Sequence, residues 1–158
     1  MDAFSIHGGQ RLTGKISVDG SKNAALPLLA ASLLTSESLE FECVPDLSDI
    51  SSMYRLLEEL GCSVNQDGNS VKIKTVDETQ SHARYDIVRT MRASVCVLGP
   101  MLARRGIARV SMPGGCSFGD RPIDLHLRGL EALGARIELD GGDIIVRAER
   151  LHGATIFL

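Results

Sequence analysis

The sequence contains no apolar run long enough to span a membrane. Its longest run, Ala24–Leu34, has 11 residues and includes Pro27, whereas a membrane-spanning helix needs about 20 apolar residues. A polar segment of 23 residues precedes this run, which argues against a secretory signal peptide. Because 44% of the residues are hydrophobic and 23% are charged, the composition is typical of a soluble globular domain. We therefore expect a cytoplasmic protein without a membrane partner.

An excess of positive charge is also missing. The formal net charge is −3, so nothing favours a nucleic-acid partner. The four cysteines form no CxxC pair, and no cluster of Cys and His has the spacing of metal ligands. We therefore expect reduced thiols rather than a disulfide framework, and neither a metal nor another cofactor. The cysteines are Cys43, Cys62, Cys96 and Cys116.

The chain contains an internal repeat. A shift of 73 residues, without gaps, aligns Pro27 with Pro100 and Cys43 with Cys116. The same shift aligns the motif LEELG, which ends at Gly61, with LEALG further along the chain. Matches at one offset over more than forty positions are hard to obtain by chance. We therefore interpret the chain as copies of one structural unit.

Both copies predict the same order of elements, roughly β-α-β-α-β-β. Apolar residues recur at helical spacing, and Asp-Gly between alternating segments predicts a hairpin. We expect Pro27 and Pro100 to kink or shorten their helices, Pro122 to fit a helix start, and a glycine to end the second helix of each copy. The predicted helices cover 22–34, 49–61, 92–106 and 122–134, the hairpins 62–75 and 135–148, and single strands 12–18, 39–44 and 107–112, with 75–84 linking the copies.

The end of the chain resembles its beginning. LHGATIF (151–157) is similar to LTGKISV (12–18), the segment expected to open the first copy. We therefore expect unit one at about 4–76, unit two at about 77–149, and the start of a truncated third unit at 150–158. Because repeats bury their core by stacking, we interpret 1–158 as one incomplete lobe containing two of three units.

Positive side chains stand at two predicted helix starts. Lys22 and Arg92 both lie where the helix dipole disfavours a cation. One such residue is explained by a solvated side chain, but two in related helices favour an anion-binding site. Arg121 adds a third positive group, and Asn23 an amide that can orient hydroxyl or phosphate oxygens. We predict that Lys22, Arg92 and Arg121 hold a small, highly charged anion.

Cys116 lies in an unusual environment for a cysteine. The segment MPGGCSFGDRP (112–122) surrounds it with glycines, prolines and Arg121. Two interpretations remain open: an incidental small residue in a turn, or a thiolate whose pKa is lowered by nearby positive charge. Two interpretations also remain open for His126: it forms a hydrogen bond to substrate, or it caps a helix of the core. The residues alone favour the core role.

These residues belong to motifs of a known family. The segments DGSKNAALPLLAASLL, TMRAS, PGGCSFGDRPIDLH and GLEALGA closely resemble those of the UDP-N-acetylglucosamine enolpyruvyl transferases (1-carboxyvinyltransferases). The resemblance covers essentially the whole chain in collinear order. It implies an α/β fold of α+β type, the inside-out α/β barrel of the enolpyruvyl transferases. That fold has two lobes of three repeated units each, with the active site in the cleft between them.

The resemblance also implies an activity and its partners. The family transfers the enolpyruvyl group of phosphoenolpyruvate to the 3′-hydroxyl of UDP-N-acetylglucosamine and releases phosphate. This is the first committed step of peptidoglycan precursor synthesis, on which cell-wall biogenesis, cell shape and cell division depend. The family's loop cysteine is a proton donor or forms a covalent adduct, and the antibiotic fosfomycin alkylates it. By resemblance, Cys116 takes this role.

The same resemblance assigns the binding residues. Lys22, which also helps to move protons, contacts phosphoenolpyruvate together with Asn23 and Arg121. His126 lies at a position of the substrate cleft, so the resemblance strengthens its functional interpretation. Contacts to the sugar nucleotide are implied for Arg92, Arg121, Pro122, Ile123, Asp124 (near the uridine), Leu125 and His126.

The chain departs from the family pattern in its length. The family continues far beyond 158 residues and supplies an aspartate and further arginines there. We therefore expect little or no transferase activity from the chain alone, and a chain that is poorly stable or self-associating. Its expected protein partners are a second copy of itself or the missing C-terminal part. One alternative is a non-catalytic remnant that binds a sugar nucleotide or a partner protein. A weaker one is a redox sensor in which Cys116 and its repeat equivalent Cys43 react.

Overall fold

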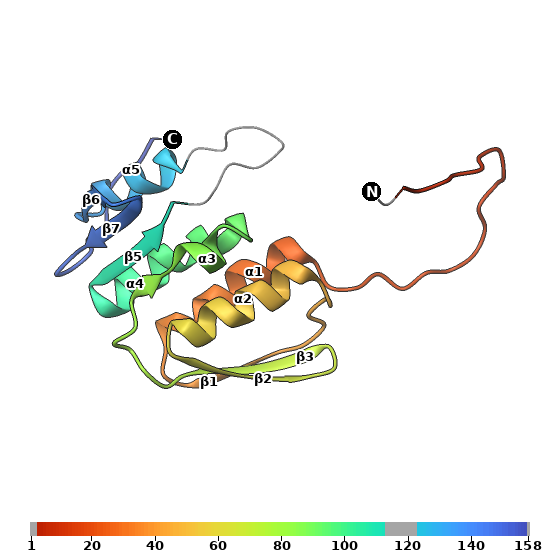
Figure 1. Cartoon of the computed structure of the whole chain (residues 1–158), viewed down its shortest axis with the longest axis horizontal. Coiled ribbons are helices and arrows are strands. Elements are labelled where there is room, and N and C mark those ends of the chain that lie inside the picture. Colours follow the sequence, from red (N-terminus) through yellow and green to blue (C-terminus); the bar gives the residue numbers. More distant parts are fainter. Residues whose placement is uncertain (1–2, 113–122, 158) are drawn as a thin grey trace.

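The computed structural model describes residues 3–112 and 123–157, in which two β-sheets enclose a layer of helices (Figure 1). One sheet has the strand order β1-β3-β2 and the other β4-β5-β7-β6. The strands are β1 Ser38–Phe41, β2 Cys62–Asp67, β3 Ser70–Thr75, β4 His82–Ala83, β5 Ile107–Ser111, β6 Arg136–Asp140 and β7 Asp143–Arg147. The helices are α1 Lys22–Ala30, α2 Ser48–Glu59, α3 Tyr85–Val88, α4 Leu98–Arg105 and α5 Asp124–Ala132, with 3₁₀ segments η1 Ala31–Leu34 and η2 Arg92–Val97.

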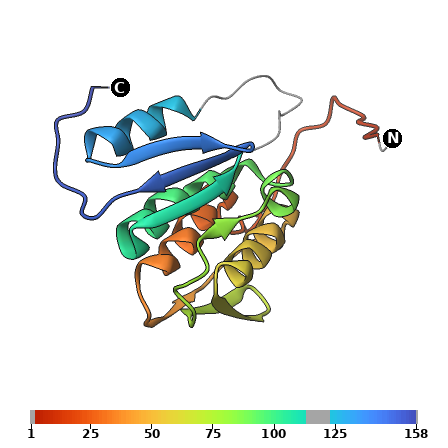
Figure 2. The same cartoon turned by 60° about the vertical axis from the view of Figure 1, so that its left-hand side comes forward.

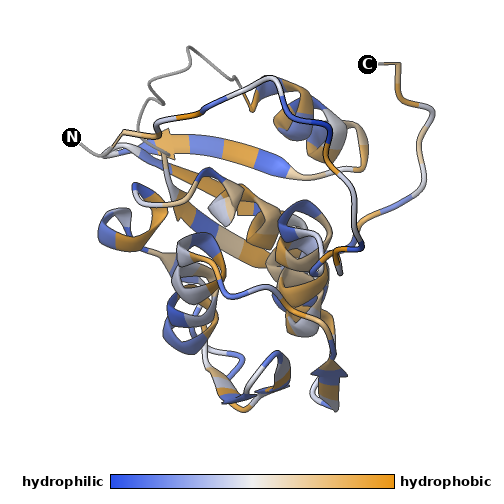
Figure 3. Ribbon diagram, turned by 90° about the vertical axis from the view of Figure 1, so that its right-hand side faces the viewer, coloured by the Kyte–Doolittle hydropathy of each residue, from blue (hydrophilic) through white to orange (hydrophobic). Residues whose placement is uncertain are grey.

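One continuous hydrophobic core joins the two sheets. The helix α2 packs on β2, α4 packs on β5 and on η1, and α1 contacts both α2 and η2. Leu29, Leu57 and Met101, one from each of these helices, are fully buried. Hydrophobic and hydrophilic residues alternate along the strands (Figure 3), as in β3, where every second side chain is buried. In the first sheet this alternation places one face on the helices and the other toward solvent. The strand β7 of the second sheet differs, because its first four residues are all buried.

Both predicted helices that contain a proline are divided into an α-helix and a 3₁₀ segment. Pro27 lies inside α1, and the chain changes to the 3₁₀ segment η1 after Ala30. In the second copy the 3₁₀ segment η2 comes first, and the α-helix α4 begins two residues before Pro100. Proline has no N–H, and its ring clashes with the carbonyl four residues earlier. Pro100 therefore fits within the first turn of α4, whereas Pro27 lies five residues after the start of α1 and is accommodated inside that helix.

The predicted glycine stops and hairpins are confirmed. Gly61 follows α2 with φ 85°, and Gly134 follows α5 with φ 99°, both in the left-handed region that favours glycine. The helix α5 begins at Asp124, and Pro122 lies outside the described residues. In the hairpins, β2 pairs with β3 and β6 with β7, each antiparallel. The Asp-Gly signal thus located both turns.

The two sheets share a common order of three strands. In one sheet it is β1-β3-β2 and in the other β5-β7-β6, with a helix, α2 or α5, between the first two strands in sequence. The second sheet has one further strand, because β4 pairs in parallel with the edge of β5. Among the described residues β1 has no such neighbour and is an open edge.

Two predicted strands and one linker assignment are wrong. Residues 12–18 and 151–157 contain no strand, and the segment 75–84, expected to be a linker, includes β4. The N-terminal segment projects away from the rest of the chain (Figures 1 and 2), and Leu12, Ile16 and Val18 are 88–93% exposed. A strand requires a hydrogen-bonding neighbour, and the described residues supply none to these segments. The alternating pattern of these segments is therefore not sufficient to form a strand.

An ion pair fastens the segment between the copies to α2. Arg84 Nε donates to Glu59 Oε1 at 2.8 Å, its NH2 group to Oε2 at 3.0 Å, and its backbone N–H to Oε1 at 3.2 Å. Burial alone would raise the pKa of Glu59, but these hydrogen bonds and the Arg84 charge lower it below its usual value. The ionised form of Glu59 is therefore stabilised by folding.

We expect Glu59→Gln to lower the free energy of unfolding by about 1–2 kcal/mol at pH 7, because a charge-assisted, bidentate contact is lost. Since the folded pKa is lowered, this stabilisation is present above the unfolded pKa of about 4.3 and disappears as pH falls through the folded pKa. Urea unfolding at pH 7 and in the acid range measures it. The neighbouring exposed Glu58 gives the control, Glu58→Gln, for which a similar loss would contradict the prediction.

Candidate active site

Lys22 stands at the start of α1, as predicted, and forms an ion pair. Ser21 caps the helix, its hydroxyl accepting from the Ala24 N–H at 3.4 Å. Lys22 Nζ donates to Asp49 Oδ2 at 2.7 Å, and the two side chains remain 42% and 32% exposed. Exposed ion pairs are weak, so a more highly charged anion from solvent can compete for Lys22.

Asp49 was not predicted from the sequence. It lies in the first turn of α2, where an acidic residue is common because it complements the helix dipole. That local signal does not identify its partner, since the pairing with Lys22 depends on how α1 packs against α2. Asp49 orients the Lys22 ammonium and joins the starts of two helices.

Two hollows adjoin the start of α1. A polar one of about 570 Å³ is lined by residues of 18–20, 43–46 and 66–69, and a smaller one of about 200 Å³ by Ser21, Ala24 and their neighbours. Gly20 borders both, and a Cβ there would lie 1.7 Å from the Cys43 carbonyl oxygen. This close approach requires glycine at position 20. The exposed Asn23 lies next to Lys22 at this end of the helix.

Arg92 begins a 3₁₀ segment rather than the α-helix that the sequence predicted. It is the first residue of η2, after Met91 in an extended conformation. The α-helix α4 begins only at Leu98, so a regular helix dipole does not reach Arg92. The segment η2 packs against α1, and Arg92 is partly exposed. Within residues 3–112 and 123–157, its side chain forms no ion pair.

The residues Ile123–His126 form the start of α5. Ile123 occupies the N-cap position and is partly buried, whereas Asp124 lies in the exposed first turn. Leu125 and His126 line an apolar hollow of about 370 Å³, across from Cys96 and Gly99. The core role expected for His126 from the residues alone is wrong, because its side chain is exposed. None of the α5 side chains is fully buried.

Cys116, Arg121 and Pro122 lie outside the described residues. The two flanks of their segment are described: β5 ends at Ser111 on one side, and α5 begins at Asp124 on the other. In Figure 1 both flanks lie in the upper part of the molecule, and α1 begins at the right, where the N-terminal segment joins it. Their place in a site shared with Lys22 and Arg92 remains a prediction.

Two of the other cysteines are chemically unfavourable nucleophiles. Burial raises the pKa of Cys62 and of Cys96, and the neutral thiol is the unreactive form. Cys62 also lies 3.6 Å from the Thr75 hydroxyl in the core. Cys43 is exposed and has φ 57°, in the left-handed region.

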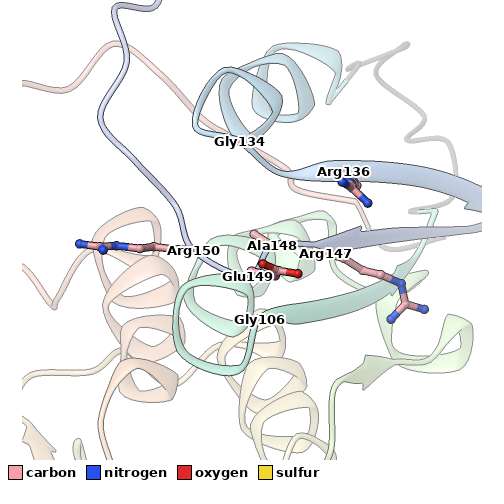
Figure 4. Close-up of a pocket in the computed structure, with 7 residues that line it drawn as sticks. All are labelled: Gly106, Gly134, Arg136, Arg147, Ala148, Glu149 and Arg150. Atoms are coloured by element: carbon pink, nitrogen blue, oxygen red, sulfur yellow. The ribbon is translucent and has the colours of Figure 1, made fainter.

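An arginine-lined cleft of about 480 Å³ (Figure 4) shares no lining residue with the two hollows at the start of α1. It adjoins Gly106, before β5, and Arg147, the register partner of Ile107. The Cys116 segment follows the opposite end of β5. Figure 4 shows the Arg147 and Arg150 side chains pointing in different directions, with Glu149 between them. These cations do not converge on one point, so we do not assign the site to this cleft.

The described part of the chain contains no group of three or more His, Cys, Asp or Glu side chains placed to hold a metal ion. In the same residues, no helix has the length and apolar composition needed to cross a membrane.

Residues 6–158 match the family model described as EPSP synthase (3-phosphoshikimate 1-carboxyvinyltransferase). The chain belongs to the EPSP synthase family. Among curated members, it is 54% identical over 158 residues to UDP-N-acetylglucosamine 1-carboxyvinyltransferase of Desulfatibacillum aliphaticivorans, and 52% identical to the protein of the same name from Methylacidiphilum infernorum. Each alignment covers all of this chain but only 38% and 37% of the relative. The chain thus spans less than two fifths of these relatives' length.

Solved structures of an enolpyruvyl transferase and of an EPSP synthase share the fold. The enolpyruvyl transferase NikO from Streptomyces tendae superposes with a TM-score of 0.76 at 23% identity, covering 92% of this chain and 32% of NikO. An EPSP synthase from Acinetobacter baumannii gives a TM-score of 0.64 at 17% identity, covering 89% of this chain and 33% of that one. The predicted α/β fold of the enolpyruvyl transferases is confirmed.

Proposed function

We propose that the chain is part of a UDP-N-acetylglucosamine 1-carboxyvinyltransferase, in which it supplies one side of the active site. The observation that carries this proposal is the 54% identity, over the whole chain, to a relative of that name. The Lys22–Asp49 pair at the start of α1 supports it, because it presents a fixed but accessible cation. The residues Ile123–His126, at the start of α5, belong to the same proposed site.

The reaction is an addition followed by an elimination. A proton adds to the methylene carbon of phosphoenolpyruvate, and the sugar 3′-hydroxyl attacks C2 and loses its proton, giving a tetrahedral intermediate. The methyl carbon then loses a proton as the C–O bond to phosphate breaks, which restores the double bond. Fixed cations stabilise the phosphate and carboxylate throughout. In this scheme Lys22, Asn23 and Arg121 hold phosphoenolpyruvate, and Lys22 also moves protons.

The remaining assignments complete the proposed site. Cys116 acts as the proton donor or forms the covalent adduct, and fosfomycin alkylates it. Arg92 and 121–126 bind the sugar nucleotide. We place this activity in the cytoplasm, at the first committed step of peptidoglycan precursor synthesis. Repeat units at about 4–76 and 77–149, with 150–158 opening a third, belong to the same proposal.

The choice of acceptor tests the function. We expect protein of the length of the curated relatives to release phosphate from phosphoenolpyruvate when UDP-N-acetylglucosamine is present, and not when 3-phosphoshikimate replaces it. Phosphate release with 3-phosphoshikimate as the acceptor, but not with UDP-N-acetylglucosamine, would contradict the proposal. The 158-residue chain, assayed in parallel, is expected to turn over little. Binding of UDP-N-acetylglucosamine by both proteins, with turnover by neither, would favour the non-catalytic alternative.

A further inference from the structure

Gly20 is the first described residue of the chain that is partly shielded from solvent. Residues 3–19 are all exposed, and they leave the molecule at the start of α1 (Figure 1). A Cβ at position 20 would lie 1.7 Å from the Cys43 carbonyl oxygen and 3.4 Å from Cδ of Pro45. The Gly20 backbone therefore lies directly against the segment that follows β1, at a distance that only glycine allows.

The segment that contacts Gly20 is itself held in place. Cys43 has φ 57°, a left-handed conformation that residues other than glycine seldom adopt. The next residue, Val44, is 7% exposed, and its N–H donates at 2.8 Å to the Asn69 carbonyl, in the turn between β2 and β3. Because both the core and the hairpin hold Val44, the Cys43 carbonyl is a fixed point against which Gly20 rests.

Gly20 lies two residues before Lys22, next to the N-cap of α1. Ser21 caps this helix, and its carbonyl accepts from the Ala25 N–H at 2.9 Å. The first buried side chain of the helix is Leu26, one turn after Lys22. Helix ends fray because their first N–H groups have no partner within the helix. The contacts of Gly20 and of Leu26 therefore restrain, from its two sides, the turn that carries Lys22.

The ion pair of Lys22 does not fix the start of α1 by itself. Lys22 Nζ lies 2.7 Å from Asp49 Oδ2, and both side chains are partly exposed. Such pairs contribute little to stability, because water screens them and ordering the side chains costs entropy. The segment after β1 leads into α2, whose first turn includes Asp49. The contact between Gly20 and Cys43 thus joins the two backbone segments that carry the partners of this ion pair.

We propose that Gly20 is a positioning residue, whose contact with Cys43 keeps the first turn of α1 from fraying and so fixes the Lys22 ammonium beside Asp49. A side chain at position 20 would force the start of the helix away from the end of β1. A displacement of about 1 Å is costly in a preorganised site, because the cation no longer meets the charge that it stabilises. The inference rests on the proposed function in one respect, that Lys22 holds the anionic substrate.

Amide hydrogen exchange of the 158-residue chain measures the fraying directly. The Ala25 amide, which is bonded to the Ser21 carbonyl, reports the first turn of α1. The Ser51 amide is bonded in the same way to the carbonyl of Leu47, the N-cap of α2, at 3.1 Å and serves as the reference. We expect Gly20→Ala to raise the ratio of the Ala25 exchange rate to the Ser51 exchange rate by about tenfold.

A second glycine beside the same hollow gives the matched control. Gly68 lines the polar hollow that Gly20 borders, but a Cβ there would meet nothing within 4 Å. Gly68→Ala should therefore leave the exchange ratio within about twofold of its starting value, although it lowers global stability. An equal rise of the ratio in Gly20→Ala and Gly68→Ala would mean general destabilisation and would overturn the proposal.

A third amide shows whether a variant remains folded. Ile73 is fully buried in β3, the central strand of the first sheet. If Gly20→Ala removes the protection of the Ile73 amide, Pro45→Gly decides, because it loosens the segment that Gly20 contacts without adding a side chain. Pro45→Gly should raise the exchange ratio about threefold while Ile73 stays protected. An unchanged ratio in a folded Gly20→Ala variant or, failing that, in Pro45→Gly overturns the proposal.

Kinetics of the transferase proposed above test the consequence for Lys22. We expect Gly20→Ala to raise KM for phosphoenolpyruvate, with a fall in kcat/KM of about tenfold, and to leave KM for the sugar nucleotide within about twofold. A mere loss of folded enzyme would lower kcat and change neither KM. If neither Gly20→Ala nor Lys22→Met lowers kcat/KM for phosphoenolpyruvate, the assigned role of Lys22 fails. If only Lys22→Met lowers it, the positioning role of Gly20 fails.

Discussion

We expect Lys22→Met to lower kcat/KM for phosphoenolpyruvate by about 10²–10³-fold in the transferase proposed above. The substitution removes the cation at the start of α1 and leaves the Asp49 carboxylate, 2.7 Å away in the starting protein, without its partner. The remaining negative charge then repels the anionic substrate. Steady-state phosphate release, with phosphoenolpyruvate varied at saturating sugar nucleotide, measures the effect.

The repulsion can be separated from the lost attraction. Adding Asp49→Asn to Lys22→Met removes the uncompensated charge, so the double variant should regain about tenfold in kcat/KM over Lys22→Met alone. The control is Lys72→Met, on the exposed face of β3, which should change kcat/KM by less than about twofold. A Lys22→Met enzyme as active as the Lys72→Met enzyme would contradict the role of Lys22.

The second large effect concerns stability. We expect Gly61→Ala to lower the free energy of unfolding by about 2–5 kcal/mol, combining the cost of a left-handed residue with that of overpacking. Gly61 has φ 85°, and a Cβ there would lie 2.0 Å from the Asp77 carbonyl oxygen. The Gly61 carbonyl also accepts from the Val76 and Asp77 N–H groups at 2.9 and 3.0 Å. Urea unfolding measures the difference.

A substitution at Gly68 separates the cost of the left-handed conformation from the cost of overpacking. Gly68 has φ 58°, and a Cβ there would meet nothing within 4 Å. Gly68→Ala should therefore cost only the left-handed conformation, about 1–2 kcal/mol. Equal losses for Gly61→Ala and Gly68→Ala would show that the junction after α2 relaxes around a methyl group.

Much of the fold could be predicted because its signals are local. The glycines that end α2 and α5 and the Asp-Gly turns act through the backbone of a few neighbouring residues. The segment 12–18 shows where this reasoning fails. Its alternation is that of a half-buried strand, yet strand formation depends on a neighbour that the pattern does not specify. Similarly, Pro100 predicted a shortened helix but not that η2 would begin at Arg92.

In the candidate site, too, the residues with a local sequence signal could be predicted, and those that depend on tertiary packing could not. Lys22 was predicted because a cation at a helix start is visible in the sequence. Its partner Asp49 was not, because the pair forms only when α1 packs against α2. The contact of Gly20 with Cys43 likewise depends on how the start of α1 packs on the end of β1, which single-sequence periodicity does not provide.

The open edge of β1 selects what can be added to it. Its backbone donors and acceptors on that side form a template for a further strand, and natural sheets restrict such templates with charge. Here Glu37, Glu40 and Glu42 lie in or beside β1, and all three are exposed. Within the sheet, Glu40 is the register partner of Lys72 on β3, but Glu37 and Glu42 at the two ends of β1 have no partner in that register. Pairing of two such edges would bring like charges together, so the acidic border opposes edge-to-edge association of two copies.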